Sequence, residues 1–100
     1  EDVIRSKIKM YLEIISPEAI LYQGEVKSIS FPGSYGDFQV LDNHAPIVST
    51  LKKGKVKIQG KMSINKEVKK YFNVSDKETF LDINSGTVEM SNNNVTLLID

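Results

Sequence analysis

Residues 55–59 read Lys55-Val56-Lys57-Ile58-Gln59, with polar and apolar side chains in strict alternation. Successive side chains of a β-strand point to opposite faces, so this alternation predicts a half-buried strand with the valine and isoleucine inside. Lys53-Gly54 precedes it and lies between two alternating segments, which predicts a hairpin turn. The stretch therefore indicates a β-sheet with one face against a core.

Similar segments come before this stretch. Expected strands run over 11–16 and 20–31, and shorter alternating runs begin at Phe38 and Ile47. The inward positions of the second strand change parity between Val26 and Ile29, which indicates a bulge or a strand that crosses between sheets. Residues 32–36 and 42–46 are expected to be loops, the first with two glycines available for positive φ.

The segments after this stretch predict three more short strands, over 80–83, 87–90 and 95–99. Ser85-Gly86 and the asparagines at 92–94 are the expected turns, because asparagine tolerates the left-handed region. Residues 60–78 are less regular and are interpreted as a long hairpin arm, with room for one short helical turn at 66–73. The predicted fold is all-β, a two-sheet β-sandwich of about eight to ten strands.

The composition excludes several classes of protein. Thirteen basic and thirteen acidic residues give a formal charge of zero, so there is no net attraction to nucleic acid. The chain has no cysteine, which removes disulfides and thiolate chemistry. Its apolar runs are far shorter than the ~20 residues of a membrane span, and no signal peptide is recognisable. A soluble, cytosolic domain is expected.

Candidate catalytic groups are few. The single histidine, His44, lies two residues after Asp42, and the pair could act as a general base and its orienting acid. A loop histidine that contacts backbone or a partner is the favoured interpretation, with no metal site and no cofactor. Residues 32–37 lack the lysine and following helix of a phosphate-binding loop. The lysines at 52, 53, 55 and 57 could meet an acidic partner, but the solvated face of an edge strand is favoured.

Three segments carry a family resemblance: Leu12-Glu13-Ile14-Ile15-Ser16-Pro17-Glu18, the stretch from Gly24 to Phe38 with Pro32-Gly33-Ser34-Tyr35-Gly36-Asp37, and His44-Ala45-Pro46-Ile47-Val48. Together they resemble the N-terminal β-sandwich of the epsilon subunit of F-type ATP synthases, called delta in mitochondria. Residues 86–90 and 94–98 are similar to the last hairpin of that family. On this basis residues 10–100 form the epsilon-type domain, and residues 1–9 are a native extension or a cloning remnant.

The resemblance implies a non-catalytic rotor subunit at the foot of the central stalk, coupling proton flow to ATP synthesis. It implies that Gly33, Ser34, Tyr35, Gly36 and Asp37 meet the polar loops of the c-ring. It also implies that His44, Ala45 and Pro46 dock on the gamma subunit. The subunit would lie peripherally at the cytoplasmic face of a bacterial inner membrane, attached only through the complex. The alternatives are a free-standing sandwich that binds a peptide or glycan and a small hydrolase using His44 and Asp42.

The sequence also departs from the family pattern. Asp42-Asn43 replaces a usual Pro-Gly, and asparagine is expected to adopt the same turn. Ser85-Gly86 replaces a usual Gly-Gly pair, and the arm at 60–78 is longer than in most relatives. Many relatives continue into two C-terminal helices where this sequence stops. A short form without those helices, and hence without their inhibitory or ATP-binding abilities, is expected.

Overall fold

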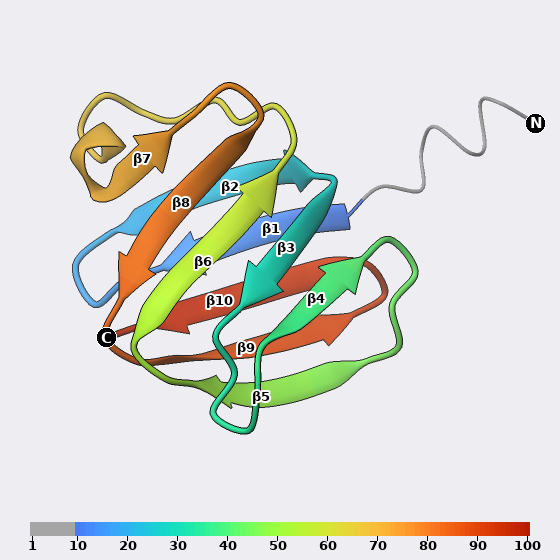
Figure 1. Ribbon diagram of the computed structural model, residues 1–100. Coiled ribbons are helices and arrows are strands. Elements are labelled where there is room, and N and C mark those ends of the chain that lie inside the picture. Colours follow the sequence, from blue (N-terminus) through green and yellow to red (C-terminus); the bar gives the residue numbers. More distant parts are fainter. Residues whose placement is uncertain (1–9) are drawn as a thin grey trace, which may run out of the picture.

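The protein is a sandwich of two five-stranded β-sheets (Figure 1). The structure is a computed structural model that describes residues 10–100, so the predicted extension at 1–9 lies outside the described residues. The elements in chain order are β1 (Met10–Ile15), β2 (Ile20–Val26), β3 (Ser28–Phe31), β4 (Phe38–Leu41), β5 (Ile47–Leu51), β6 (Gly54–Gln59), η1 (Lys69–Tyr71), β7 (Phe72–Val74), β8 (Glu78–Ile83), β9 (Gly86–Ser91) and β10 (Asn94–Ile99). The prediction of a two-sheet sandwich is confirmed, and η1 is the short helical turn expected within 66–73.

The first sheet has the strand order β2-β1-β10-β9-β5, and the second has the order β4-β3-β6-β8-β7. Strands β1 and β10 run parallel, and the remaining pairs are antiparallel. The alternating residues of both sheets face each other, and the fully buried ones include Leu12, Ile14, Ile29, Val56, Ile58 and Leu97. The core therefore lies between the sheets. Burying each such side chain stabilises the fold by about 1.5–3 kcal/mol.

The parity shift between Val26 and Ile29 marks a crossing between the sheets. Strand β2 ends at Val26 in the first sheet, and β3 begins at Ser28 in the second. Between them, the Lys27 N–H donates a hydrogen bond of 2.7 Å to the carbonyl of Gln59. Of the two alternatives left open by the sequence, the crossing strand is therefore correct.

The hairpin predicted at Lys53-Gly54 is wrong. Strand β5 belongs to the first sheet and β6 to the second, so the chain crosses here as well. The Lys52 N–H donates to the Pro32 carbonyl at 2.9 Å, and a Cβ on Gly54 would lie 2.9 Å from Pro32 Cβ. The alternation of polar and apolar residues on both sides of a turn is the same in a hairpin and in a crossing to the other sheet. The sequence pattern therefore could not distinguish the two.

The long hairpin arm is also wrong over most of its length. Residues 61–68 form no strand, and the hairpin is limited to β7 and β8. Within residues 61–68, Met62, Ile64 and Val68 pack into the core instead. An irregular segment that places its apolar side chains in this way satisfies neither a strand nor a helix period, which is why its pattern was indistinct.

Strand β6 is central in its sheet, so its lysines do not guard an edge. Lys55 Nζ lies 3.0 Å from Asp82 Oδ1, and Lys57 Nζ lies 3.5 Å from Glu78 Oε2 on the neighbouring strand. The prediction that these lysines lie on the solvent-facing side of a strand is correct. There they form ion pairs with acidic residues of the neighbouring strand and do not protect a sheet edge.

Candidate interaction surfaces

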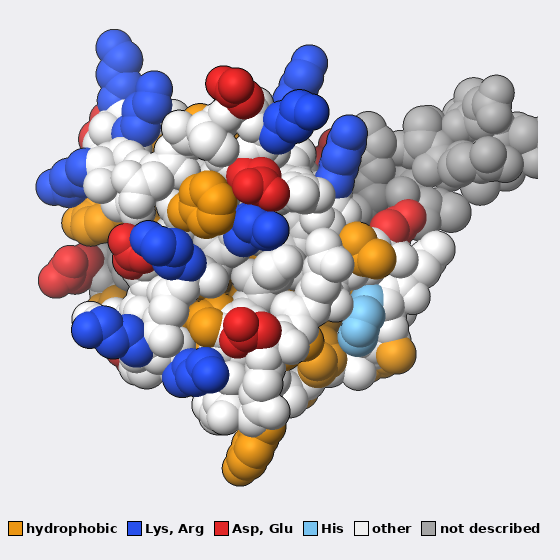
Figure 2. Space-filling view, in the orientation of Figure 1, with side chains coloured by type: hydrophobic (Ala, Val, Ile, Leu, Met, Phe, Trp, Pro, Cys, Tyr) orange, Lys and Arg blue, Asp and Glu red, His pale blue; other side chains and the backbone are white. Residues whose placement is uncertain are grey.

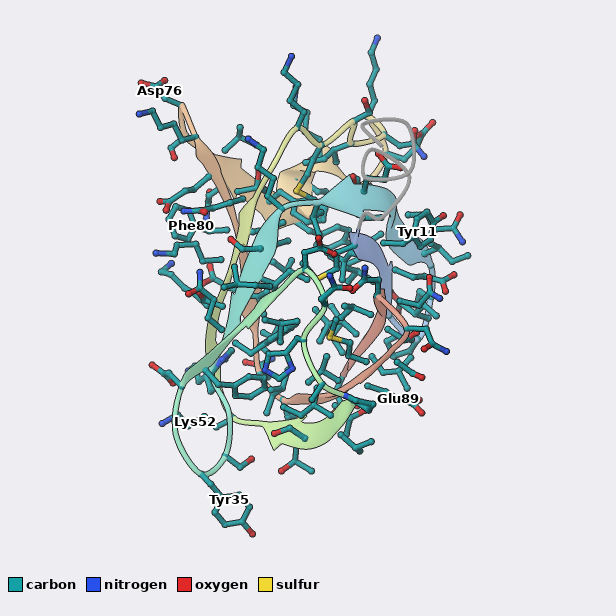
Figure 3. All side chains as sticks on the ribbon, turned by 90° about the vertical axis from the view of Figure 1, so that its right-hand side faces the viewer. Tyr11, Tyr35, Lys52, Asp76, Phe80 and Glu89 are labelled. Carbon is teal, nitrogen blue, oxygen red and sulfur yellow. The ribbon has the colours of Figure 1, made fainter. Side chains whose placement is uncertain are left out.

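The tip loop, Gly33–Asp37, projects from one end of the sandwich between β3 and β4. Figure 3 shows Tyr35 pointing away from the rest of the molecule, and the residue is fully exposed. Three hydrogen bonds hold the loop, two of them between backbone groups. The Ser34 N–H donates to the Thr50 carbonyl at 3.0 Å, the Gly36 N–H donates to the Gly33 carbonyl at 3.1 Å, and the Ser34 and Thr50 hydroxyls bond at 2.9 Å. The loop therefore has a defined shape without any partner.

Two glycines fix that shape for different reasons. Gly36 has φ +134°, which side-chain-bearing residues rarely adopt, whereas Gly33 is needed for space. A Cβ on Gly33 would lie 2.5 Å from the Gly36 carbonyl oxygen and 2.8 Å from the Phe38 ring. The expectation of positive φ thus holds for Gly36. Tyr35 and Asp37, both exposed, are carried outward on this rigid turn.

The second loop, Asp42–Pro46, is tied to the turn between β9 and β10. The Asn43 N–H donates to Asn93 Oδ1 at 2.8 Å, and Asn93 Nδ2 donates to Asp42 Oδ1 at 2.7 Å. Asn43 has φ 65°, as expected for a residue that replaces glycine. Asn93 has φ 62°, so both asparagines use the left-handed region that their positions predicted. The Asp42–Pro46 loop is thus preorganised by a side chain from a distant turn.

His44 lies among exposed apolar groups. Figure 2 shows the single histidine with hydrophobic side chains on either side of it. Leu41, Ala45 and Pro46 are exposed in the same stretch, and Val48 is 78% exposed on the edge strand β5. This small patch, Leu41–Val48, has the mixed apolar and polar character of a protein contact.

The structure does not assemble the hydrolase alternative. The Asp42 carboxylate accepts a hydrogen bond from Asn93, and His44 Nδ1 lies 2.7 Å from the Ala45 carbonyl oxygen. The two side chains therefore bond to other groups and not to each other. Within residues 10–100, no group of three or more His, Cys, Asp or Glu side chains could hold a metal ion. Across the same residues, no helix has the length and hydropathy needed to span a bilayer.

Charge is strongly segregated, which the zero total conceals. Residues 52–77 contain nine lysines and two acidic residues, Glu67 and Asp76, for a formal charge of +7. The other described residues contain nine acidic residues and Lys27, for a formal charge of −8. The five strands of the first sheet have Glu13, Glu25 and Glu89 but no lysine or arginine. Sequence reasoning missed this division because it used the total; counting charge along the chain would have found it.

Local contacts shift the acidity of two groups. The Gln59 amide donates to Glu78 Oε2 at 3.1 Å, and together with the Lys57 ammonium it lowers the pKa of the Glu78 carboxyl. Burial raises the pKa of the Tyr22 phenol, and the neighbouring Tyr11 and Glu25 add to the effect. Both are explained by packing and charge pairing within the sheets. Neither group belongs to a catalytic arrangement.

Comparison with known proteins matches residues 9–100 to a family model, ATP synthase, Delta/Epsilon chain, beta-sandwich domain. The ATP synthase epsilon chain of Leptospira interrogans is 39% identical over 92 residues, 92% of this chain and 61% of the relative. That of Campylobacter jejuni is 50% identical over 56 residues, 56% of this chain and 43% of the relative. The chain thus spans about three fifths of the length of the curated relatives it matches.

Solved structures share the fold. A chain of the mitochondrial ATP synthase of Euglena gracilis, solved as its OSCP/F1/c-ring part, matches with TM-score 0.70 and 17% identity, over 92% of this chain and 51% of that one. A chain from the central stalk and c-ring of the Tetrahymena thermophila mitochondrial ATP synthase matches with TM-score 0.66 and 18% identity, over 91% and 63%. At these identities the likeness concerns the fold.

Proposed function

The chain belongs to the ATP synthase delta/epsilon beta-sandwich family, and from that premise we propose that it is a non-catalytic central-stalk subunit of a proton-translocating ATP synthase. The observation that carries the proposal is the family match over residues 9–100. In this role the chain binds its neighbours and transmits torque between proton flow and ATP synthesis. It works at the cytoplasmic face of a bacterial inner membrane, held there by the complex.

The tip loop is the proposed contact with the c-ring. Its backbone is fixed before binding, so little conformational entropy is lost on docking. Tyr35 offers a large contact area with few rotatable bonds, and Asp37 offers a charge for a polar or basic ring loop. The full exposure of Tyr35 supports this role, because an aromatic side chain gains most from being covered.

The Asp42–Pro46 loop is the proposed contact with the gamma subunit, through His44, Ala45 and Pro46. Pro46 fixes its own φ and keeps Ala45 extended, while Asn93 anchors the start of the loop. The exposed Leu41 and Val48 extend the apolar part of this surface. A preshaped loop with an apolar margin is suited to a permanent subunit contact.

Co-purification tests the function directly. An affinity-tagged chain, expressed in its native host, is expected to recover the catalytic and gamma subunits and the c-ring from gently solubilised membranes. Pro46→Gly is expected to reduce recovery of the gamma subunit while leaving the urea midpoint near that of the parent. Pro17→Gly, at an exposed proline in the β1–β2 turn, is the matched control. Recovery of the tagged chain without any synthase subunit would refute the proposal.

A further inference from the structure

The basic arm, residues 61–71, carries lysines that have no acidic partner within the described part of the chain. Lys61, Lys66, Lys69 and Lys70 are all exposed, and none forms an ion pair with any of residues 10–100. By contrast, both lysines in the middle of the second sheet, Lys55 and Lys57, face an acidic residue. The arm therefore keeps a local excess of positive charge that the sandwich itself does not neutralise.

The basic arm is nevertheless an ordered part of the domain. Val68 is buried, Met62 and Ile64 pack against the same core, and the buried Phe72 of β7 follows directly. The Val68 N–H donates to the Asn65 carbonyl at 3.1 Å, and the Tyr71 N–H donates to the Val68 carbonyl at 3.0 Å. Because the inner side chains anchor the segment, its lysines are held at defined places on the surface. Such a surface loses less entropy on binding than a flexible loop would.

The arm lies at the opposite end of the molecule from the tip loop. Figure 3 shows Tyr35 at one end and Asp76, which follows β7, at the other. Figure 1 places η1 and β7 at that same far end, and Figure 2 shows basic side chains projecting along it. With the tip on the ring, the arm points away from the membrane, toward the soluble part of the complex.

We propose that the basic arm is a third contact surface, which binds an acidic protein surface of a neighbouring synthase subunit on the side away from the ring. This inference rests on the proposed function, which supplies the orientation. Lysines that form no ion pair within the domain and lie on an anchored segment are complementary to carboxylates, and such complementarity sets orientation and association rate. Tyr71, which is 47% exposed with Lys70 Nζ 5.4 Å from its ring, adds apolar area suited to a protein partner. With the tip on the ring, the membrane and its anionic lipids lie at the end of the domain opposite the arm.

Carbodiimide cross-linking in the purified complex locates the contact, because it joins lysines to carboxylates that already form ion pairs. We expect Lys66, Lys69 or Lys70 to be joined to an aspartate or glutamate of another subunit. Cross-links elsewhere on this chain, but none from the arm, would overturn the inference.

Binding of the chain to the ring-free head, depleted of this subunit, gives the matched comparison. Lys66→Glu/Lys69→Glu/Lys70→Glu is expected to weaken binding about tenfold at about 50 mM KCl, and much less at about 300 mM, where charges are screened. Lys52→Glu/Lys53→Glu/Lys55→Glu changes the net charge equally near the other end and is expected to stay within about twofold. Urea unfolding of both variants checks that the fold is retained.

The outcomes separate the two proposals. Parent-like binding of the arm variant at low salt overturns the arm contact and leaves the proposed function standing. Normal binding of that variant to the head, with lost binding to phosphatidylglycerol vesicles, assigns the arm to lipid and also overturns it. If the parent chain itself does not bind the head, the proposed function fails.

Discussion

The tip loop and the basic arm lie at opposite ends of the sandwich, and they are shaped in different ways. The tip is defined by its backbone, since Gly36 uses a positive φ and Gly33 leaves no space for a Cβ. The arm is defined mainly by its side chains, because Val68 and the following Phe72 insert into the core while residues 61–68 form no helix or strand. A loop whose shape depends on its backbone can be recognised in the sequence by a motif of glycines. A segment that is anchored by its side chains shows only a pattern of charged and apolar residues. The tip, the Asp42–Pro46 loop and the arm are the three proposed contact surfaces.

The anchoring of the arm is tested most strongly at Phe72, the β7 residue that directly follows it, which is 7% exposed. Phe72→Ala is expected to lower the free energy of unfolding by about 3–5 kcal/mol, because it removes a buried ring and leaves a cavity. Urea denaturation measures the effect. Its neighbour Tyr71 is the control, and Tyr71→Ala is expected to cost less than about 1 kcal/mol. Equal effects at the two positions would mean that the arm is not anchored as described.

The backbone definition of the tip is tested at Gly33. Gly33→Ala is expected to destabilise the domain by about 1–3 kcal/mol, since the added methyl group would collide with the Gly36 carbonyl and the Phe38 ring. Tyr35→Ala, two residues away, is expected to change stability by less than about 0.5 kcal/mol. Thermal unfolding of both variants decides the point. A stable Gly33→Ala protein would show that the tip is more adaptable than its contacts indicate.

The Asp42–Pro46 loop lies between these two cases, since a side chain from another turn fixes its backbone. Asn93→Ala is expected to cost about 1–2 kcal/mol, because it removes two hydrogen bonds and places alanine at φ 62°. Asn93→Gly accepts that φ and isolates the loss of the hydrogen bonds, so a smaller effect is expected. Hydrogen exchange at the Asn43 N–H is expected to accelerate in both variants, and unchanged exchange would contradict the anchoring role.

The smallest effect expected is the pH response of the paired charges in the second sheet. The lowered pKa of Glu78 means that its contribution to stability is present above the ordinary carboxyl pKa. That contribution is lost as the pH falls through the lower folded-state pKa. Glu78→Gln is therefore expected to flatten part of the acid decline in the urea midpoint. Asp82→Asn, which removes the same charge from the same strand, separates this effect from net charge; identical profiles would contradict it.

Local features of the fold were predictable from the sequence, whereas the sheet assignments were not. The alternation at 55–59 correctly placed Val56 and Ile58 in the core, and the asparagines at 43 and 93 adopt the turns expected of them. The pattern around Lys53-Gly54 predicts a hairpin where the chain in fact crosses between sheets, because alternation does not show which sheet a strand joins. That choice depends on contacts far apart in the chain, such as the hydrogen bond between Lys52 and Pro32.

The positions of the two candidate loops were predictable to a similar degree, whereas their contacts with other subunits remain predictions. The residues of the tip and of the Asp42–Pro46 loop were found by motif, and the structure adds their anchors, Thr50 and Asn93. Those anchors could not be predicted, since Asn93 lies 50 positions from Asn43. The lysines of the basic arm can be read directly from the sequence. The zero net charge of the whole chain hides their local excess, because acidic residues elsewhere balance them.

The central claim, that the tip loop couples this subunit to the ring, is tested most directly by ATP-driven proton pumping in reconstituted vesicles. Asp37→Ala is expected to weaken pumping little, since one exposed ion pair contributes only ~0–1 kcal/mol. Tyr35→Ala combined with Asp37→Lys removes the packing and reverses the charge. In that double variant, pumping is expected to fall while ATP hydrolysis by the complex persists. Unchanged pumping, with the variant subunit fully incorporated, would contradict it.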